Sequence, residues 1–309
     1  MLRNCCVIHG KRRIVIKSIF IHGESMSNNV RGPGSTFKFS DDVAINYQVL
    51  GQGNCPMLLI HGFGASLESW SDIEPLLADH FRLYLIDLKG CGYSSKPRAG
   101  GYSPIDQAEI VAAFIDENRL QNLVLVGHSY GGAVALLTYL RLENTANQSK
   151  HIDSLVLIDA AVYPQKLPFF VSIPRIPILN RLILDLIPAR EQARFTLTHL
   201  FYDSSKIGRE RIDRYAHFYD LPGSRGALIK LGEQIFPQNI HSLTNEISNI
   251  SVPTLIIWGD SDPAVPVEQG YRLQNSIKMS KLEIIEHCGH VPQEEKPQET
   301  ARIMKKFLL

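Results

Sequence analysis

The chain has 309 residues, of which 44% are hydrophobic and 20% are charged, so it can bury a large core and is not expected to be disordered. Its formal net charge of +1 lacks the positive excess that binding to a nucleic-acid backbone requires. The most apolar stretch, residues 167–187, is interrupted by prolines and arginines. It therefore falls short of the roughly 18 uninterrupted apolar residues of a membrane span.

The cysteines are odd in number and show no repeated CxxC spacing. They therefore predict neither a zinc site nor a disulfide framework. We expect reduced thiols, as in cytosolic proteins, and the predicted location of the chain is the cytoplasm. The cysteines are Cys5, Cys6, Cys55, Cys91 and Cys288.

The first 35 residues have a different composition, because several basic residues precede the first acidic residue, Glu24. A secretory signal would need an uninterrupted apolar stretch of about 7–15 residues, and Lys17 interrupts residues 14–21. Targeting to an organelle by this basic leader is an open alternative. The preferred interpretation is a poorly ordered N-terminal extension, residues 1–35, on which function does not depend.

From residue 36 onward, short β-rich runs alternate with helical patterns. Residues 43–49 alternate like a half-exposed strand, and residues 106–117 have the apolar spacing of a helix. The other runs are apolar on both faces, as in a parallel sheet covered by helices. This alternation predicts a doubly wound α/β fold. The apolar runs are residues 57–60, 83–86, 123–126, 155–158 and 255–258, and residues 282–285 are a further short predicted strand.

The alternation is interrupted once, between residues 162 and 250, where no strong strand run occurs. This segment contains several prolines and helical patterns such as residues 209–219. A helical insertion between two strands of one sheet explains the gap. We therefore predict an α/β core formed by residues 36–161 and 251–309, with residues 162–250 as a helical cap.

Gly127-His128-Ser129-Tyr130-Gly131 stands directly between an apolar strand and a helical pattern. In that context a tight strand-to-helix turn exposes the serine hydroxyl, and the flanking glycines let the backbone pass closely. The pentapeptide lacks the lysine of a P-loop and the glycine spacing of a dinucleotide site. Ser129 is therefore the predicted nucleophile.

A serine nucleophile needs a base, and the base needs an orienting acid. His290 follows a glycine in the loop after the last predicted strand, and we prefer it as the base over His287. For His61 and His128 a supporting role is the better interpretation than proton transfer.

Three aspartates that follow predicted strands are candidates for the acid. Asp262 is preferred, because Asp260 directly follows a glycine turn and is suited to bonding its own backbone. Asp159, at the end of another strand, stays open as an alternative. In the preferred set the order along the chain is serine, acid, histidine.

The turn after the first buried strand, His61-Gly62-Phe63-Gly64, can place a backbone N–H opposite the nucleophile. The predicted oxyanion hole consists of the backbone N–H groups of Phe63 and Tyr130.

Together these segments resemble the α/β-hydrolase superfamily over residues 36–309, and the insertion resembles the cap of its epoxide hydrolase, haloalkane dehalogenase and C–C bond hydrolase branch. The resemblance implies an eight-stranded, mostly parallel sheet with helices on both faces, a Ser129–Asp262–His290 triad, and neither a cofactor nor a bound metal. The matching segments are residues 61–64, 87–94, 127–132, 258–262 and 289–290.

Departures from these relatives narrow the expected chemistry. Serine at position 129 replaces the aspartate of epoxide hydrolases and haloalkane dehalogenases and the cysteine of dienelactone-type hydrolases. The meta-cleavage-product hydrolases, which break C–C bonds, often have asparagine before the serine, whereas this chain has His128. We therefore predict a carboxylesterase with a small to medium apolar substrate. A C–C bond hydrolase and a hydrolase-fold ligand-binding protein are the alternatives.

The expected partner is a small-molecule ester or a related carbonyl compound. The cap is rich in apolar and aromatic residues, some of which would line the substrate pocket while most pack the cap itself. Contact with a membrane through residues 167–184 is not favoured, because the prolines prevent a long amphipathic helix. The sequence predicts no particular oligomeric state.

Overall fold

The computed structural model describes residues 30–143, 151–166, 172, 186–236 and 244–309. Their centre is an eight-stranded sheet in the order β1-β2-β4-β3-β5-β6-β7-β8. β1 and β4 each pair antiparallel with β2, and all other neighbours are parallel. The predicted eight-stranded, mostly parallel sheet is confirmed. The strands are β1 (Ser35–Lys38), β2 (Ala44–Leu50), β3 (Cys55–Ile60), β4 (Phe81–Ile86), β5 (Leu123–His128), β6 (Ile152–Ile158), β7 (Thr254–Gly259) and β8 (Ser280–Ile285).

Every strand run expected from the sequence coincides with an observed strand, and only the run at residues 43–49 starts one residue before its strand, β2. β5 and β7 are buried at all positions, as strands covered on both faces must be. β1 was not predicted, because it has four residues of which only Phe37 is buried. Its pairing with β2 holds it at the sheet edge.

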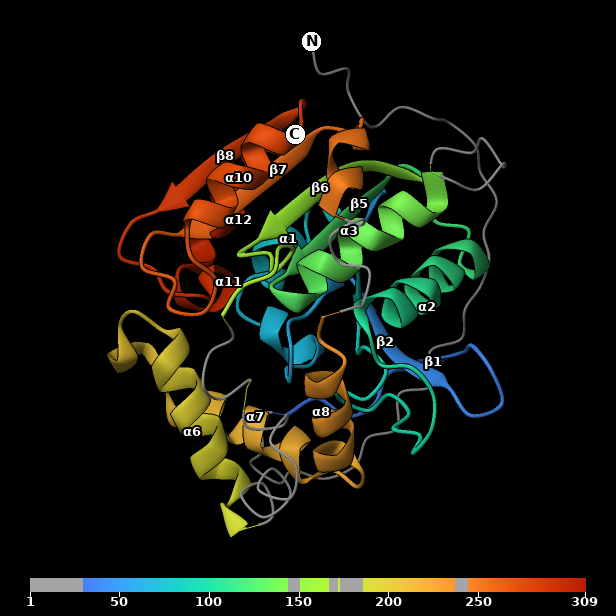
Figure 1. Cartoon of the computed structure of the whole chain (residues 1–309), viewed down its shortest axis with the longest axis vertical. Helices are drawn as coiled ribbons and strands as arrows, with labels where there is room; N and C mark the ends of the chain where they lie inside the picture. The colour runs from blue at the N-terminus through green and yellow to red at the C-terminus, as the bar shows by residue number, and fades with distance from the viewer. Residues whose placement is uncertain (1–29, 144–150, 167–171, 173–185, 237–243) are drawn as a thin grey trace.

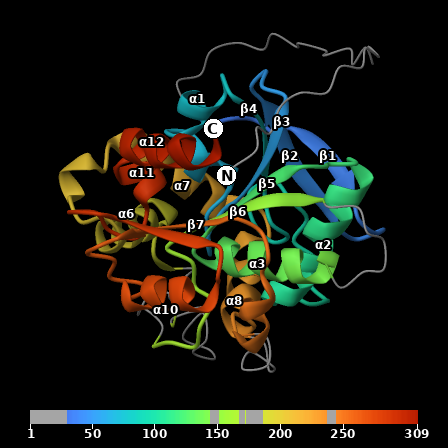
Figure 2. The same ribbon diagram turned by 90° about the horizontal axis from the view of Figure 1, so that it is seen from above.

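Helices cover both faces of the sheet, as Figure 2 shows. α2, α3 and α10 lie on one face, and α1 and α12 lie on the other. α2 begins two residues before the predicted start, since Ser103 and Asp106 form a reciprocal capping box and Pro104 occupies the first turn. The helices are α1 (Glu74–Leu77), α2 (Pro104–Glu117), α3 (Tyr130–Glu143), α10 (Glu268–Ser276), α11 (Pro292–Glu295) and α12 (Pro297–Leu308), and the 3-10 helix η1 (Leu67–Trp70) precedes α1.

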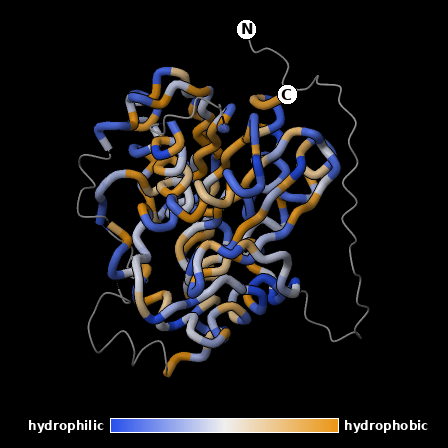
Figure 3. The backbone as a smooth tube through the Cα atoms, turned by 90° about the vertical axis from the view of Figure 1, so that its right-hand side faces the viewer, coloured by the Kyte–Doolittle hydropathy of each residue, from blue (hydrophilic) through white to orange (hydrophobic). Residues whose placement is uncertain are grey.

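The hydrophobic core is divided by the sheet into two clusters, and Figure 3 shows the apolar segments gathered in the interior. The larger cluster lies under α2 and α3, where the fully buried Phe114 packs edge-on against the rings of Phe37, Tyr47 and Tyr84. The smaller one lies under α1 and α12. Because the sheet is buried on both faces, its strands are held in place, and so are the points at which the connecting loops begin.

Between β6 and β7 the described residues form helices and no strand. α6, α7 and α8 gather at one end of the molecule, toward which the arrowheads of β6 and β8 point (Figure 1). They are α6 (Ala189–Leu200), α7 (Arg209–Asp220) and α8 (Ser224–Glu233), with the short 3-10 helices η3 (Ser204–Lys206) and η4 (Glu246–Asn249). No helix in the described part of the chain is long and apolar enough to cross a membrane.

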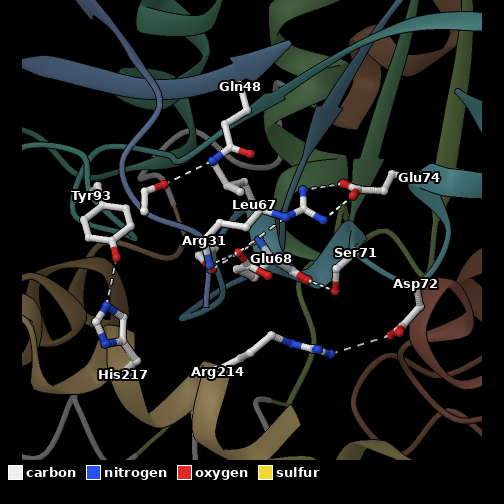
Figure 4. A network of polar contacts seen from close by, with 12 residues as sticks. Arg31, Gln48, Leu67, Glu68, Ser71, Asp72, Glu74, Tyr93, Arg214 and His217 are labelled. Carbon is white, nitrogen blue, oxygen red and sulfur yellow. Dashed lines mark hydrogen bonds and ion pairs between the residues drawn. The ribbon is translucent and has the colours of Figure 1, made fainter. Parts of the chain in front are cut away.

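At the N-terminal side, Arg31 and Gly34 are bonded to η1, α1 and β2. Arg31 forms an ion pair with Glu74 and donates its backbone N–H to Glu68 (Figure 4). The backbone N–H of Gly34 donates to Asn46, directly before β1 begins. The rest of the predicted extension, residues 1–29, lies outside the described residues.

Phe114 allows a test of this packing. Phe114→Ala would remove a fully buried ring that contacts three others, and we expect the free energy of unfolding to fall by about 3–5 kcal/mol. Ile105→Ala on the exposed side of the same helix is the control and should change it by about 0.5 kcal/mol or less. Urea denaturation measures both, and equal losses would contradict the assignment of this core.

Candidate active site

Ser129 occupies the sharp turn between β5 and α3. Its φ is +52°, a conformation that residues other than glycine rarely adopt. Its N–H donates to Ile158 O at 2.9 Å, which ties the turn to the end of β6. A Cβ at Gly127 or Gly131 would lie 2.3–2.4 Å from backbone oxygens, so the turn requires glycine on both sides.

The structure brings Ser129, His290 and Asp262 into one hydrogen-bonded row. Ser129 Oγ lies 2.8 Å from His290 Nε2, and His290 Nδ1 lies 2.7 Å from Asp262 Oδ2. An ionised Asp262 can only accept, so Nδ1 carries the proton and Nε2 is the acceptor for the serine hydroxyl. The row can therefore transfer the serine proton to the histidine.

Asp262 is fixed by its own loop. Its Oδ1 accepts the backbone N–H groups of Ala264 at 2.7 Å and Val265 at 2.9 Å, which leaves Oδ2 for His290. Asp260 instead accepts from Ser261 and from the N–H of Cys288, and thus joins two loops.

The alternative histidine, His287, does not reach the serine. It is exposed, its φ is +50°, and its ring lies against that of Tyr202 at a centroid distance of 5.5 Å.

The turn after β3 and the first residue of α3 each supply a backbone donor that stays unused in the described part of the chain. The N–H of Leu88 donates to His61 Nε2, so His61 carries its proton on Nδ1 and donates it to Gly62 O at 2.8 Å. This bond fixes the peptide that joins Gly62 to Phe63. Within the described residues, neither the N–H of Phe63 nor that of Tyr130 has an acceptor, and the two rings pack edge-on at 6.4 Å. Gly62 lies against Ser129, since a Cβ there would be 3.3 Å from Ser129 Cβ.

His128 contacts His290 through a hydrogen bond and through its ring. Its Nε2 donates to the backbone oxygen of His290 at 2.7 Å, and the two rings lie 4.9 Å apart. Burial, with a smaller contribution from His290, lowers the pKa of His128 well below its ordinary value. Burial likewise lowers the pKa of His61. Both rings are therefore neutral near pH 7 and place no competing positive charge beside His290.

The loop that carries His290 is bonded to the chain that connects α6 with α7. The N–H of His290 donates to Leu200 O at 2.8 Å. Glu295 accepts the N–H groups of Gly289 at 2.8 Å, Tyr202 at 3.1 Å and Asp203 at 2.8 Å. The sequence analysis missed Glu295, because an acidic residue at a helix end has no distinctive pattern.

α7 is attached to the sheet domain by polar contacts. Arg211 contacts Glu294 at 2.6 Å and Asp72 at 2.8 Å, and Tyr215 donates to Glu294 at 2.6 Å. Figure 4 shows two further contacts, Arg214 with Asp72 and Tyr93 with His217. Burial raises the pKa of Glu294, and Arg211 opposes that rise. The two arginines are thus paired with carboxylates of the sheet domain.

A cleft lies beside the turn that carries Phe63. Gly64 and Ala65 form one wall, and α6, α7 and α8 form the other. Apart from Gln192, Ser224 and Arg225, the lining is mostly apolar or backbone. The remaining lining residues are Gly90, Cys91, Gly92, Phe218, Tyr219, Leu228 and Leu231.

One group of potential metal ligands occurs in the described part of the chain, namely Asp159, Asp262 and His290. Their ligand atoms lie within 4.8 Å of one another. Asp262 and His290 already use these atoms in the hydrogen-bonded row, so the group does not form an open coordination shell.

Known proteins share the fold of this chain. A family profile described as the alpha/beta hydrolase fold matches residues 56–297. The chain is 28% identical, over 86% of its length and 92% of the relative, to 2-hydroxy-6-oxononadienedioate/2-hydroxy-6-oxononatrienedioate hydrolase 1 of Pseudomonas putida. It is 29% identical, over 83% of its length and 76% of the relative, to monoacylglycerol lipase abhd6-B of Xenopus laevis.

A crystal structure of a variant of the meta-cleavage product hydrolase CumD, from Pseudomonas fluorescens, is also similar. It is 25% identical, has a TM-score of 0.73, and the match covers 89% of this chain and 97% of that one.

The buried neutral histidines predict how stability depends on pH. In the folded state the pKa of His128 is lowered below its unfolded-state value of about 6.5. The contribution of His128 to the free energy of unfolding is therefore fully present above about pH 6.5 and is lost as the pH falls below that value. Each such histidine contributes a slope of up to about 1.4 kcal/mol per pH unit.

We therefore expect the free energy of unfolding to fall less steeply between pH 6.5 and 5 in His128→Asn than in the wild type. Urea denaturation at several pH values measures the slope. His80→Asn, at an exposed position, is the control and should keep the wild-type slope. Identical slopes in all three proteins would show that His128 is not held neutral.

Proposed function

The chain belongs to the α/β-hydrolase family, and from that premise we propose that it is a serine hydrolase that cleaves carboxylic esters of small to medium apolar substrates. The observation that supports this proposal most strongly is the unbroken row from Ser129 through His290 to Asp262. Such a row converts a weakly nucleophilic hydroxyl into an attacking group.

In the proposed acylation step, His290 Nε2 takes the Ser129 proton while Oγ bonds to the ester carbonyl carbon. The N–H groups of Phe63 and Tyr130 donate to the resulting oxyanion, and each such donor is typically worth about 3 kcal/mol. His290 then gives its proton to the leaving oxygen as the C–O bond breaks. The products are a free alcohol and an acyl group on Ser129.

Deacylation reverses the same proton path. His290 takes a proton from water as the water oxygen bonds to the acyl carbon, and it returns that proton to Ser129 Oγ as the acyl–enzyme bond breaks. Asp262 stabilises the charged form of His290 in both steps and keeps Nε2 directed at the serine. No cofactor takes part in this sequence of steps.

We also propose that residues 36–161 and 251–309 act as the catalytic core and residues 162–250 as a cap. The contacts of α7 with Asp72 and Glu294, and of the α6–α7 connection with Glu295, support a cap held against the core. The mostly apolar cleft between Gly64 and these helices supports binding of an apolar part of the substrate there.

The proposed location of the enzyme is the cytoplasm.

C–C bond hydrolysis is the second candidate, because the similar P. putida protein is named for a substrate of that kind. Such a dioate carries carboxylates, which a pocket would bind with basic side chains. In the described cap, Arg211 and Arg214 face carboxylates of the core. Arg225, the basic residue of the cleft lining, is paired with Asp220. The Xenopus relative is named a lipase of monoacylglycerols, which are esters. These observations together favour the ester.

Ser129→Ala tests the nucleophile. We expect kcat for a p-nitrophenyl ester to fall by roughly 10³- to 10⁶-fold, because the acyl-enzyme cannot form. Ser248→Ala, at an exposed position, is the matched control and should leave the rate unchanged. Unaltered turnover by Ser129→Ala would refute the assignment.

A substrate panel tests the bond that is cleaved. Short-chain apolar esters should give the highest kcat/KM, above long-chain esters and above a ring-cleavage product with a vinylogous keto acid. Steady-state kinetics on the wild type measures all three, with Ser129→Ala as the blank. A preference for the ring-cleavage product would replace the ester proposal with C–C bond hydrolysis.

A further inference from the structure

Asp159 lies directly behind the hydrogen-bonded row. It follows the last residue of β6, is fully buried, and has a φ of +43°. Its Oδ1 accepts the N–H of Gly259 at 3.0 Å, which joins the ends of β6 and β7. A non-glycine residue in this strained backbone region is uncommon and tends to mark functional sites.

The second carboxyl oxygen of Asp159, Oδ2, is buried and has no N–H or hydroxyl donor to accept from among the described residues. The carboxyl groups of Asp159 and Asp262 nevertheless lie close together, because Asp159, Asp262 and His290 have side-chain atoms within 4.8 Å of one another. A hydrogen bond between two such carboxyl groups requires a proton on one of them.

The other titratable groups around Asp159 supply no fixed positive charge. Glu295 on α11 and Cys288 in the loop after β8 act on it, besides Asp262 and His290. Two buried carboxylates whose oxygens lie within 4.8 Å of each other, without a fixed cation, disfavour double ionisation, so the pair favours holding one proton near neutral pH.

The hydrogen bonds decide which residue keeps that proton. Asp262 accepts two backbone N–H groups and the N–H of His290, all of which favour its anion. Asp159 accepts one backbone N–H. We propose that Asp159 is a protonated positioning residue whose hydroxyl donates to Asp262 and keeps the carboxyl pair at a single negative charge.

The pKa of Asp159 agrees in direction, because burial, and then the charge of Asp262, raise it well above its ordinary value. The kinetic consequence rests on the proposed function. The Asp159 hydroxyl orients Asp262 and withdraws charge from it, which keeps His290 from becoming too basic to return its proton. The protonation state itself does not rest on that function.

Infrared difference spectroscopy on protein with isotope-labelled aspartate tests the protonation state directly. At neutral pH we expect a carboxylic-acid C=O band in the wild type that disappears in Asp159→Asn. Asp153→Asn, at an exposed position on the same strand, should retain the band. Absence of the band from the wild type, or its persistence in Asp159→Asn, would overturn the proposal even if no ester were a substrate.

Kinetics tests the positioning role. Asp159→Ala should lower kcat/KM for the ester by about tenfold and move the acidic limb of its pH profile upward by about 0.5 unit. Asp159→Asn keeps a neutral donor of the same size, so its kcat/KM and the position of its acidic limb should be close to those of the wild type. A loss in Asp159→Asn as large as that in Asp262→Asn would instead identify Asp159 as an ionised acid and refute the proposal. Thermal unfolding of each variant establishes that it is folded.

Discussion

The two hydrogen bonds of the His290 ring are the constraint on which the arrangement depends. One joins it to Ser129 at 2.8 Å and the other to Asp262 at 2.7 Å, so the three loops that follow β5, β7 and β8 must agree in placing these side chains within hydrogen-bond distance. Parallel neighbouring strands provide this agreement, because their carboxyl ends lie at one edge of the sheet. The buried strands therefore serve the chemistry by fixing where their loops begin.

The described residues around the His290 ring restrict its movement and place no competing positive charge beside it. His128 holds the backbone oxygen of His290, and Leu200 accepts its N–H. Glu295 then joins the same loop to the connection between α6 and α7. A displacement of that connection would thus act on the loop of His290 through hydrogen bonds. His61 and His128 are neutral, and a proton is proposed on Asp159. Asp262 is therefore the charged group that contacts the His290 ring.

The strand runs and the Ser129 turn could be predicted, because they depend on local patterns of apolar residues and glycines. Asp262 and His290 could be chosen because loops after parallel strands converge. The relation of Asp159 to Asp262 could not be predicted, since the sequence places both after parallel strands but does not show that their carboxyl groups lie together or that Asp159 Oδ2 lacks a donor among the described residues. Glu295 and Arg211 likewise look like ordinary helical charges until the fold pairs them. β1 was missed because a short, mostly exposed strand has almost no apolar pattern.

Ser129 is proposed to be an activated nucleophile, and labelling with a fluorophosphonate tests this most directly. Mass spectrometry after proteolysis should find one phosphonyl group, on Ser129, and labelling should be much slower in His290→Ala. This result would also separate an enzyme from a binding protein of the same fold. Folded wild-type protein that stays unlabelled, or is labelled on another serine, would contradict the account.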